Sequence, residues 1–137
     1  MAPQTVLVDT NIFLEFLREQ ERSEACLQLM RKIERGEIEA YVTSFTLHGI
    51  EISLERVHEI EGLEKFLDWV SQTTALTVYH TSPEEELQVA ALTKTTGLDF
   101  DDALQYYVTK TLGAVLVSFD RDFDHTDIER IEPSDMA

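Results

Sequence analysis

Hydrophobic and polar positions along the chain alternate between short apolar runs and longer segments in which apolar residues recur at helical spacing. The short runs are rich in β-branched residues, which is typical of buried strands. The predicted strands span 5–8, 40–42, 76–79 and 114–120, with a short fifth strand over 128–131. Near-continuous apolar strands that alternate with helices indicate a parallel sheet covered on both faces, so we expect an α/β fold.

The helical segments carry recognisable ends. Gly36 and Gly113 end two of them, and "TSPEEE" begins another with a capping hydroxyl, a proline and three glutamates. The predicted helices begin near Asn11, Ser23, Thr43 or Ser44, Glu61, Ser82 and Asp99. We expect a single domain over 1–137, because this length supports one core and the sequence shows no linker, repeat or low-complexity tract.

Carboxylates occur where strands end and helices begin. Asp9 ends the first strand, Asp120 follows the fourth, and the helix that leads into the fourth strand opens with Asp99, Asp101 and Asp102. Because the carboxyl ends of parallel strands share one edge, we expect these acids to lie close together. Each acid taken alone is explained as a helix cap, and Asp99 is expected to be one. Capping does not explain why several acids converge on one edge.

Converging carboxylates repel one another unless a cation or shared protons relieve the repulsion. Oxygen donors without histidine or cysteine favour Mg²⁺ or Mn²⁺ over zinc. The candidate catalytic acids and metal ligands are Asp9, Glu51, Asp102 and Asp120, with Asp122 near a second ion. The neighbouring polar residues expected to orient these acids are Thr10, Asn11 and Ser118.

Composition limits the classes of function. With 27 acidic and 11 basic residues the formal net charge is -16, so bulk electrostatics oppose the binding of a polyanion. Arg121 and Lys94 are candidate phosphate contacts, although solvated ion pairs are a commoner role. No apolar stretch spans a bilayer and no secretion signal is evident, so we expect a cytoplasmic protein without a membrane partner. The single cysteine, Cys26, is expected to be a packing residue.

The segments "VLVDTNIFLEFL" and "LDFDDALQYYVTKTLGAVLVSFDRDF", and the order of elements between them, resemble the PIN-domain ribonucleases, including the VapC-like toxins of toxin–antitoxin pairs. The matching motif positions are Asp9 with Thr10 and Asn11, Asp102 with Ala103, and Ser118 with Asp120. The resemblance implies a three-layer α/β/α sandwich with strand order 3-2-1-4-5 and divalent-metal-dependent cleavage of RNA. It also implies a small antitoxin partner and a homodimer.

The second acid of the family pattern departs from this match. Its usual position falls on Gly49, whereas the nearest acid is Glu51. Two residues correspond to about 200° of rotation on a helix, so both residues cannot face the same way. We favour Glu51 as the second acid and retain a three-acid site as the alternative. His48, one turn before Glu51, is expected to be a surface residue.

Two other functions remain open. A binding module for metal, RNA or protein requires no catalysis and becomes the better explanation if Glu51 points away from the other acids. An aspartyl phosphotransfer enzyme would use Asp9 as its nucleophile. However, "DTNIF" lacks a second aspartate two residues on, and no lysine ends a strand where such an enzyme requires one.

Overall fold

A computed structural model of the chain describes residues 4–136. At its centre lies a five-stranded sheet in which every neighbouring pair of strands is parallel. The strand order is β3-β2-β1-β4-β5, which confirms the expected α/β class and topology. The strands are β1 (Gln4–Val8), β2 (Ile38–Thr43), β3 (Leu76–Tyr79), β4 (Val115–Val117) and β5 (Arg130–Ile131).

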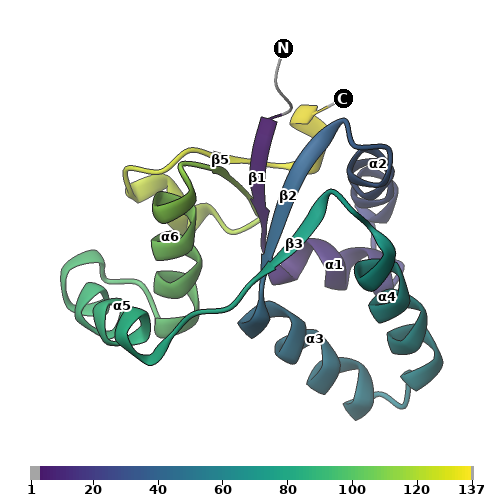
Figure 1. Ribbon diagram of the computed structural model, residues 1–137, viewed down its shortest axis with the longest axis horizontal. Helices are drawn as coiled ribbons and strands as arrows, with labels where there is room; N and C mark the ends of the chain where they lie inside the picture. The colour runs from purple at the N-terminus through teal and green to yellow at the C-terminus, as the bar shows by residue number, and fades with distance from the viewer. Residues whose placement is uncertain (1–3, 137) are drawn as a thin grey trace.

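Helices cover both faces of the sheet. The first four α-helices lie on one side of the strands and the last two on the other, which gives the three layers of the sandwich (Figure 1). The helices are α1 (Thr10–Leu17), α2 (Ser23–Glu34), α3 (Ser44–Arg56), α4 (Ile60–Gln72), α5 (Pro83–Thr96) and α6 (Phe100–Leu112), with 3-10 helices η1 (Arg121–His125) and η2 (Pro133–Met136). No helix within the described range has both the length and the apolar character needed to cross a membrane.

The core is divided by the sheet into two apolar clusters. Val6 and Val8 of β1 pack with α1 to α4, whereas Leu7 between them packs with α5 and α6, and all three are fully buried. This alternation follows from the two-residue period of a strand. Burial of one such side chain contributes about 1.5–3 kcal/mol, so the central strands hold their carboxyl ends firmly in place.

Cys26 lies on α2 within the larger of these clusters and is fully buried. The prediction that it is a packing residue is therefore confirmed. Burial, together with the nearby carboxylate of Glu15, raises the pKa of its thiol to about 11. At neutral pH the thiol is protonated and unreactive.

Only β3 has the predicted bounds, and the other strands differ from the prediction at one end or both. β2 begins at Ile38 because Gln4 and Thr5 of β1 extend the pairing to Ile38 and Glu39. β4 covers only Val115–Val117 and β5 only Arg130–Ile131. Beyond β4, the backbone N–H groups of 119 and 120 donate to side-chain oxygens instead of to a neighbouring strand. The chain therefore leaves the sheet at the edge where the acids were expected.

Candidate metal centre

A cavity of about 420 Å³ lies at this edge of the sheet. Asp9 reaches it from the end of β1, Asp102 from the first turn of α6, and Asp120 from the loop after β4. The cavity is lined by Asp9, Thr10, Asn11, Leu14, Phe45, Gly49, Ser53, Asp101, Asp102, Gln105 and Asp120. Three of the four predicted catalytic acids therefore lie together.

The carboxylate of Asp9 is surrounded by hydrogen-bond donors. Its Oδ1 atom accepts from the backbone N–H of Thr10 at 2.8 Å and from Nε2 of Gln105 at 2.9 Å. Its Oδ2 atom accepts from Oγ of Ser118 at 2.7 Å and from Nδ2 of Asn11 at 3.4 Å. Burial raises the pKa of Asp9, while the bonds from Ser118, Gln105 and Thr10 oppose that shift. Donors on both oxygens fix the orientation of this carboxylate.

Ser118 and Asn11 lie where the sequence predicted them, against Asp9. Oγ of Ser118 accepts from Nδ2 of Asn11 at 3.2 Å and from the backbone N–H of Asp120 at 3.0 Å. Because both lone pairs are used, the single hydroxyl proton is directed to Asp9. Thr10 differs from the expectation, since its hydroxyl hydrogen-bonds Oγ1 of Thr46 at 2.8 Å and only its backbone N–H contacts Asp9.

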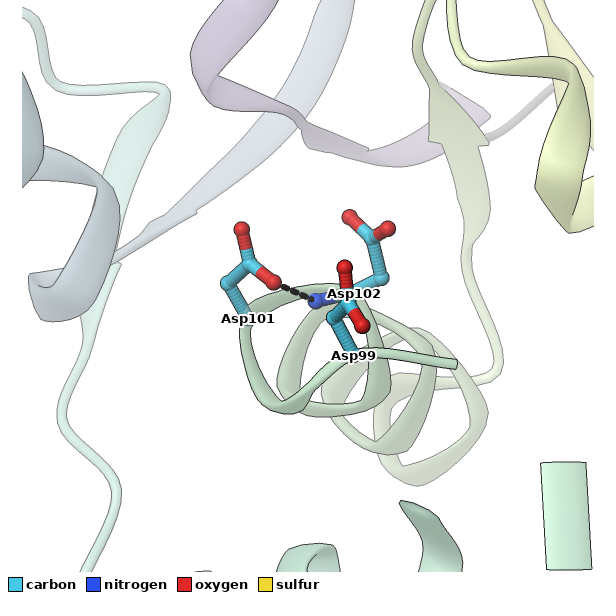
Figure 2. A group of neighbouring side chains, drawn as sticks. All are labelled: Asp99, Asp101 and Asp102. Atoms are coloured by element: carbon cyan, nitrogen blue, oxygen red, sulfur yellow. Dashed lines mark hydrogen bonds between the residues drawn. The ribbon is translucent and has the colours of Figure 1, made fainter. Parts of the chain in front are cut away.

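The acids at the start of α6 have different surroundings (Figure 2). Asp99 occupies the N-cap position, but its carboxylate accepts no capping hydrogen bond, so the cap expected from its side chain is absent. Oδ1 of Asp101 instead accepts from the backbone N–H of Asp102 at 3.0 Å. The side chain of Asp102 does not cap the helix and lines the cavity.

The pKa of Asp102 is raised by its burial and by the neighbouring carboxylates. Burial, together with repulsion from Asp101, Asp120, Asp9 and Asp99, raises its pKa to about 7. Asp102 therefore retains its proton up to about neutral pH unless a cation replaces that proton.

A second grouping of acids extends from the cavity. Single carboxylate oxygens of Asp102, Asp120 and Asp122 lie within 4.8 Å of one another. Asp122 lies outside the main cavity and lines a neighbouring hollow of about 350 Å³ with Asp99, Asp102 and His125. Clustered carboxylate oxygens are the donors that a hard divalent cation requires, so these residues fit Mg²⁺ or Mn²⁺.

The structure does not bring Glu51 to the cavity. Oγ1 of Thr43 accepts from the backbone N–H of Thr46 at 3.1 Å, which begins α3 at Ser44 and sets the phase of the helix. The residues of α3 that line the cavity are Phe45, Gly49 and Ser53, spaced four apart. Glu51 lies about 200° from Gly49 around the helix, and its Oε1 atom is 3.0 Å from Nδ1 of His48. The expected position of Glu51 is thus corrected.

Several residues of the site were missed by the sequence analysis. Gln105 follows Asp102 by one turn and is buried at the cavity wall, and Thr46 and Thr43 hydrogen-bond its amide. A polar residue between the apolar Leu104 and Tyr106 was the available signal for Gln105. The two candidate phosphate contacts, Lys94 and Arg121, are exposed, and neither lines the cavity.

Solved structures share this fold. They include VapC20 of Mycobacterium tuberculosis, described as a Sarcin-Ricin loop cleaving toxin, with a TM-score of 0.77, 17% identity, and coverage of 93% of this chain and 99% of that chain. A toxin–antitoxin complex from Klebsiella pneumoniae has a TM-score of 0.69 and 16% identity, and the match covers 93% of this chain and 97% of that chain. VapBC2 of Rickettsia felis, bound to a DNA fragment from its promoter, has a TM-score of 0.67 and 14% identity, and the match covers 94% of this chain and 98% of that chain. At these identities the likeness shows the fold alone.

Among curated proteins, none matches the sequence significantly. The family model described as "PIN domain" matches residues 6–129, which include the three acids of the cavity. The match covers most of the chain, and the sheet order and the motif positions agree with it. This chain belongs to the PIN-domain family.

Proposed function

We propose that this protein is a divalent-metal-dependent endoribonuclease that hydrolyses RNA phosphodiester bonds and acts in the cytoplasm as the toxin of a toxin–antitoxin pair. The observation that carries the proposal is the convergence of Asp9, Asp102 and Asp120 on one cavity. Membership of the PIN-domain family supports it. Further support comes from VapC20, a protein of similar fold that is described as a Sarcin-Ricin loop cleaving toxin.

Asp9, Asp102 and Asp120 would hold Mg²⁺ or Mn²⁺, with Asp122 beside the latter two. When bound, such an ion supplies positive charge that stabilises the scissile phosphate and lowers the pKa of water. Of the described residues, none that lines the cavity is lysine or arginine. In a chain with a formal net charge of -16, a cation at this site is what allows a phosphate to approach.

The residues of the chain have distinct tasks in this proposal. Asp9 is a preoriented ligand, because Ser118 and Gln105 hold its two oxygens. Asp102 carries a proton up to about neutral pH and would have to release it to hold a cation. Ser118 is not a nucleophile, because it is fully buried and its hydroxyl oxygen already accepts hydrogen bonds from Asn11 and from the backbone N–H of Asp120.

Phe45 supplies an apolar surface for the substrate. Its side chain lines the cavity and remains 42% exposed at the start of α3. Nucleobases of single-stranded RNA stack on exposed aromatic rings regardless of sequence. A base stacked on Phe45 would hold a neighbouring phosphodiester close to the three acids.

The presence of glycine at position 49, where the family pattern has an acid, favours one alternative function. This is a weakly active or non-catalytic module that binds metal, RNA or protein. The residues of α3 that line the cavity include no acid, so the position at which the family pattern has its second acid carries no carboxylate. An aspartyl phosphotransferase is disfavoured, because Asn11 stands two residues after Asp9 where such an enzyme has a second aspartate, and the described residues that line the cavity include no lysine.

The experiment is incubation of the purified protein with a mixed RNA pool in Mg²⁺, in Mn²⁺ and in excess chelator. Cleavage with either metal and none with chelator supports the ribonuclease. Metal binding without cleavage would favour the binding module, and cleavage that survives the chelator would exclude the proposed site.

The partners proposed are a small antitoxin and a second copy of the chain. The Klebsiella pneumoniae structure of similar fold is a toxin–antitoxin complex, which supports the antitoxin. Expression of the protein should arrest growth, and co-expression of a small protein encoded beside it should relieve the arrest. Sedimentation equilibrium tests for the dimer.

A further inference from the structure

The side chain of Gln105 links three elements beneath the cavity. It lies on α6 and is only 2% exposed. Nε2 donates to Oδ1 of Asp9 at 2.9 Å and to Oγ1 of Thr46 at 2.8 Å. Oε1 accepts from Oγ1 of Thr43 at 3.1 Å. One amide therefore contacts the end of β1, the end of β2 and the first turn of α3.

The amide has only one orientation that satisfies these partners. An ionised carboxylate can only accept hydrogen bonds, so the nitrogen of Gln105 must face Asp9. Both hydrogens of that nitrogen are then used, and the oxygen faces Thr43. The hydroxyl of Thr46 completes the network through Oγ1 of Thr10 at 2.8 Å. Each heavy atom of the amide is held, so the group cannot turn away from Asp9 without losing several bonds.

We propose that Gln105 is a positioning residue for Asp9, which holds Oδ1 from the α6 side while Ser118 holds Oδ2 from the β4 side. The proposal rests on the proposed function, because it concerns the readiness of Asp9 to bind a divalent cation. Polar groups that orient a ligating side chain raise metal affinity by fixing its geometry before the ion arrives. A purely structural role would explain the bonds to the two threonines but assigns nothing to the bond with Asp9.

The test is the affinity for Mn²⁺ alone, measured by calorimetry and by the electron paramagnetic resonance of the free ion. Gln105→Met preserves volume and removes the amide, and we expect it to weaken Mn²⁺ binding by about 10- to 100-fold. Thr109→Val is the matched control. Thr109 is buried one turn further along α6, and its hydroxyl donates only to the backbone oxygen of Gln105 at 2.8 Å. Its affinity for Mn²⁺ should stay within about twofold of the unmodified protein, because Asp9 is untouched.

A second variant keeps the proposal testable if Gln105→Met fails to fold. Thr46→Val removes one acceptor of the Gln105 amide without touching Asp9, and it should weaken Mn²⁺ binding by at least about threefold. The inference would be overturned if Gln105→Met bound Mn²⁺ as tightly as the unmodified protein does. If Gln105→Met fails to fold, the same result for Thr46→Val would overturn it. An equal loss in Thr109→Val would also overturn it, because the loss would then come from general disturbance of α6. If the unmodified protein binds no Mn²⁺, the proposed function fails together with the inference.

Discussion

Oε1 of Glu51 lies 3.0 Å from Nδ1 of His48, one turn earlier on α3. This pair occupies a different face of the helix from Gly49, which lines the cavity with the three acids. Glu51 is the acid nearest to Gly49 in the sequence, but the rotation between the two positions on α3 keeps its carboxylate away from the candidate metal centre. The acids of the predicted ribonuclease site come from the end of β1, from α6, where Asp101 lies beside Asp102, and from the loop after β4, and there is open space at Gly49 where α3 could supply another.

Replacement of Glu51 should have little effect on activity. Glu51→Gln removes the charge of a carboxylate that is hydrogen-bonded to His48 on a partly exposed face and does not line the cavity. We expect RNA cleavage to change by less than about threefold, which corresponds to under 1 kcal/mol in the activation free energy. The measurement is the single-turnover rate at saturating Mn²⁺. A loss of orders of magnitude would show that Glu51 does reach the ion.

Gly49→Glu should strengthen metal binding. A Cβ added at Gly49 would meet no heavy atom within 4 Å, so there is room for a side chain to begin at this position of the cavity wall. We expect the affinity for Mn²⁺ to rise by about tenfold, because a further carboxylate ligand joins the site. Ile52→Glu, at an exposed position of α3 that does not line the cavity, adds the same charge and is the control. If the two variants bind Mn²⁺ equally, the fourth position is not at Gly49.

Asp102→Asn should stabilise the metal-free protein in a pH-dependent way. The pKa of Asp102 is raised from its ordinary value of 3.8 to about 7, so the folded state binds more protons than the unfolded state between these values. Stability from this group is therefore complete below about pH 4 and is lost as the pH rises to about 7. The gain in melting temperature from Asp102→Asn should be small at pH 4, grow to pH 7 and then level. A gain independent of pH would contradict the raised pKa.

Phe45→Ala should weaken RNA binding without affecting the metal. Stacking of one base on an aromatic ring contributes about 1–3 kcal/mol, so we expect KM for RNA to rise by about tenfold or more. Phe100→Ala is the matched control, because Phe100 is similarly exposed, at 40%, near the start of α6, but does not line the cavity. An equal change in both variants, or a change in Mn²⁺ affinity, would contradict a stacking role for Phe45.

The convergence of the acids can be predicted from the sequence because it depends on local patterns. Asp9 directly follows an apolar strand, Asp102 begins a helix, and parallel strands share one carboxyl edge. The resemblance of the motifs to a known family adds the order of the strands. These features do not depend on the details of side-chain packing.

The remaining features depend on contacts between distant residues. Gln105 is hydrogen-bonded to Asp9, which lies 96 positions away in the chain, and to Thr43, which lies 62 positions away. Nothing near Gln105 in the sequence identifies these partners. The orientation of Glu51 depends on the residue at which α3 begins, and a shift of two residues turns a side chain by about 200°. The Thr43 cap sets this start, and the sequence left Thr43 and Ser44 as equal candidates.

The most direct test of the account is RNA cleavage by Asp120→Asn over a titration of Mn²⁺. Asparagine at this position can still accept the hydrogen bond from the backbone N–H of Asp122, now 2.9 Å from Oδ1 of Asp120, so the loop should keep its shape. Asp68→Asn, an exposed substitution on α4, is the control for the loss of one charge. We expect Asp120→Asn to cut RNA about 100-fold more slowly or worse at every Mn²⁺ concentration, because a bound metal contributes several kcal/mol of charge stabilisation. The unmodified protein and Asp68→Asn should cleave equally well. Equal cleavage by Asp120→Asn would contradict the assignment of this cavity as the metal-dependent ribonuclease site.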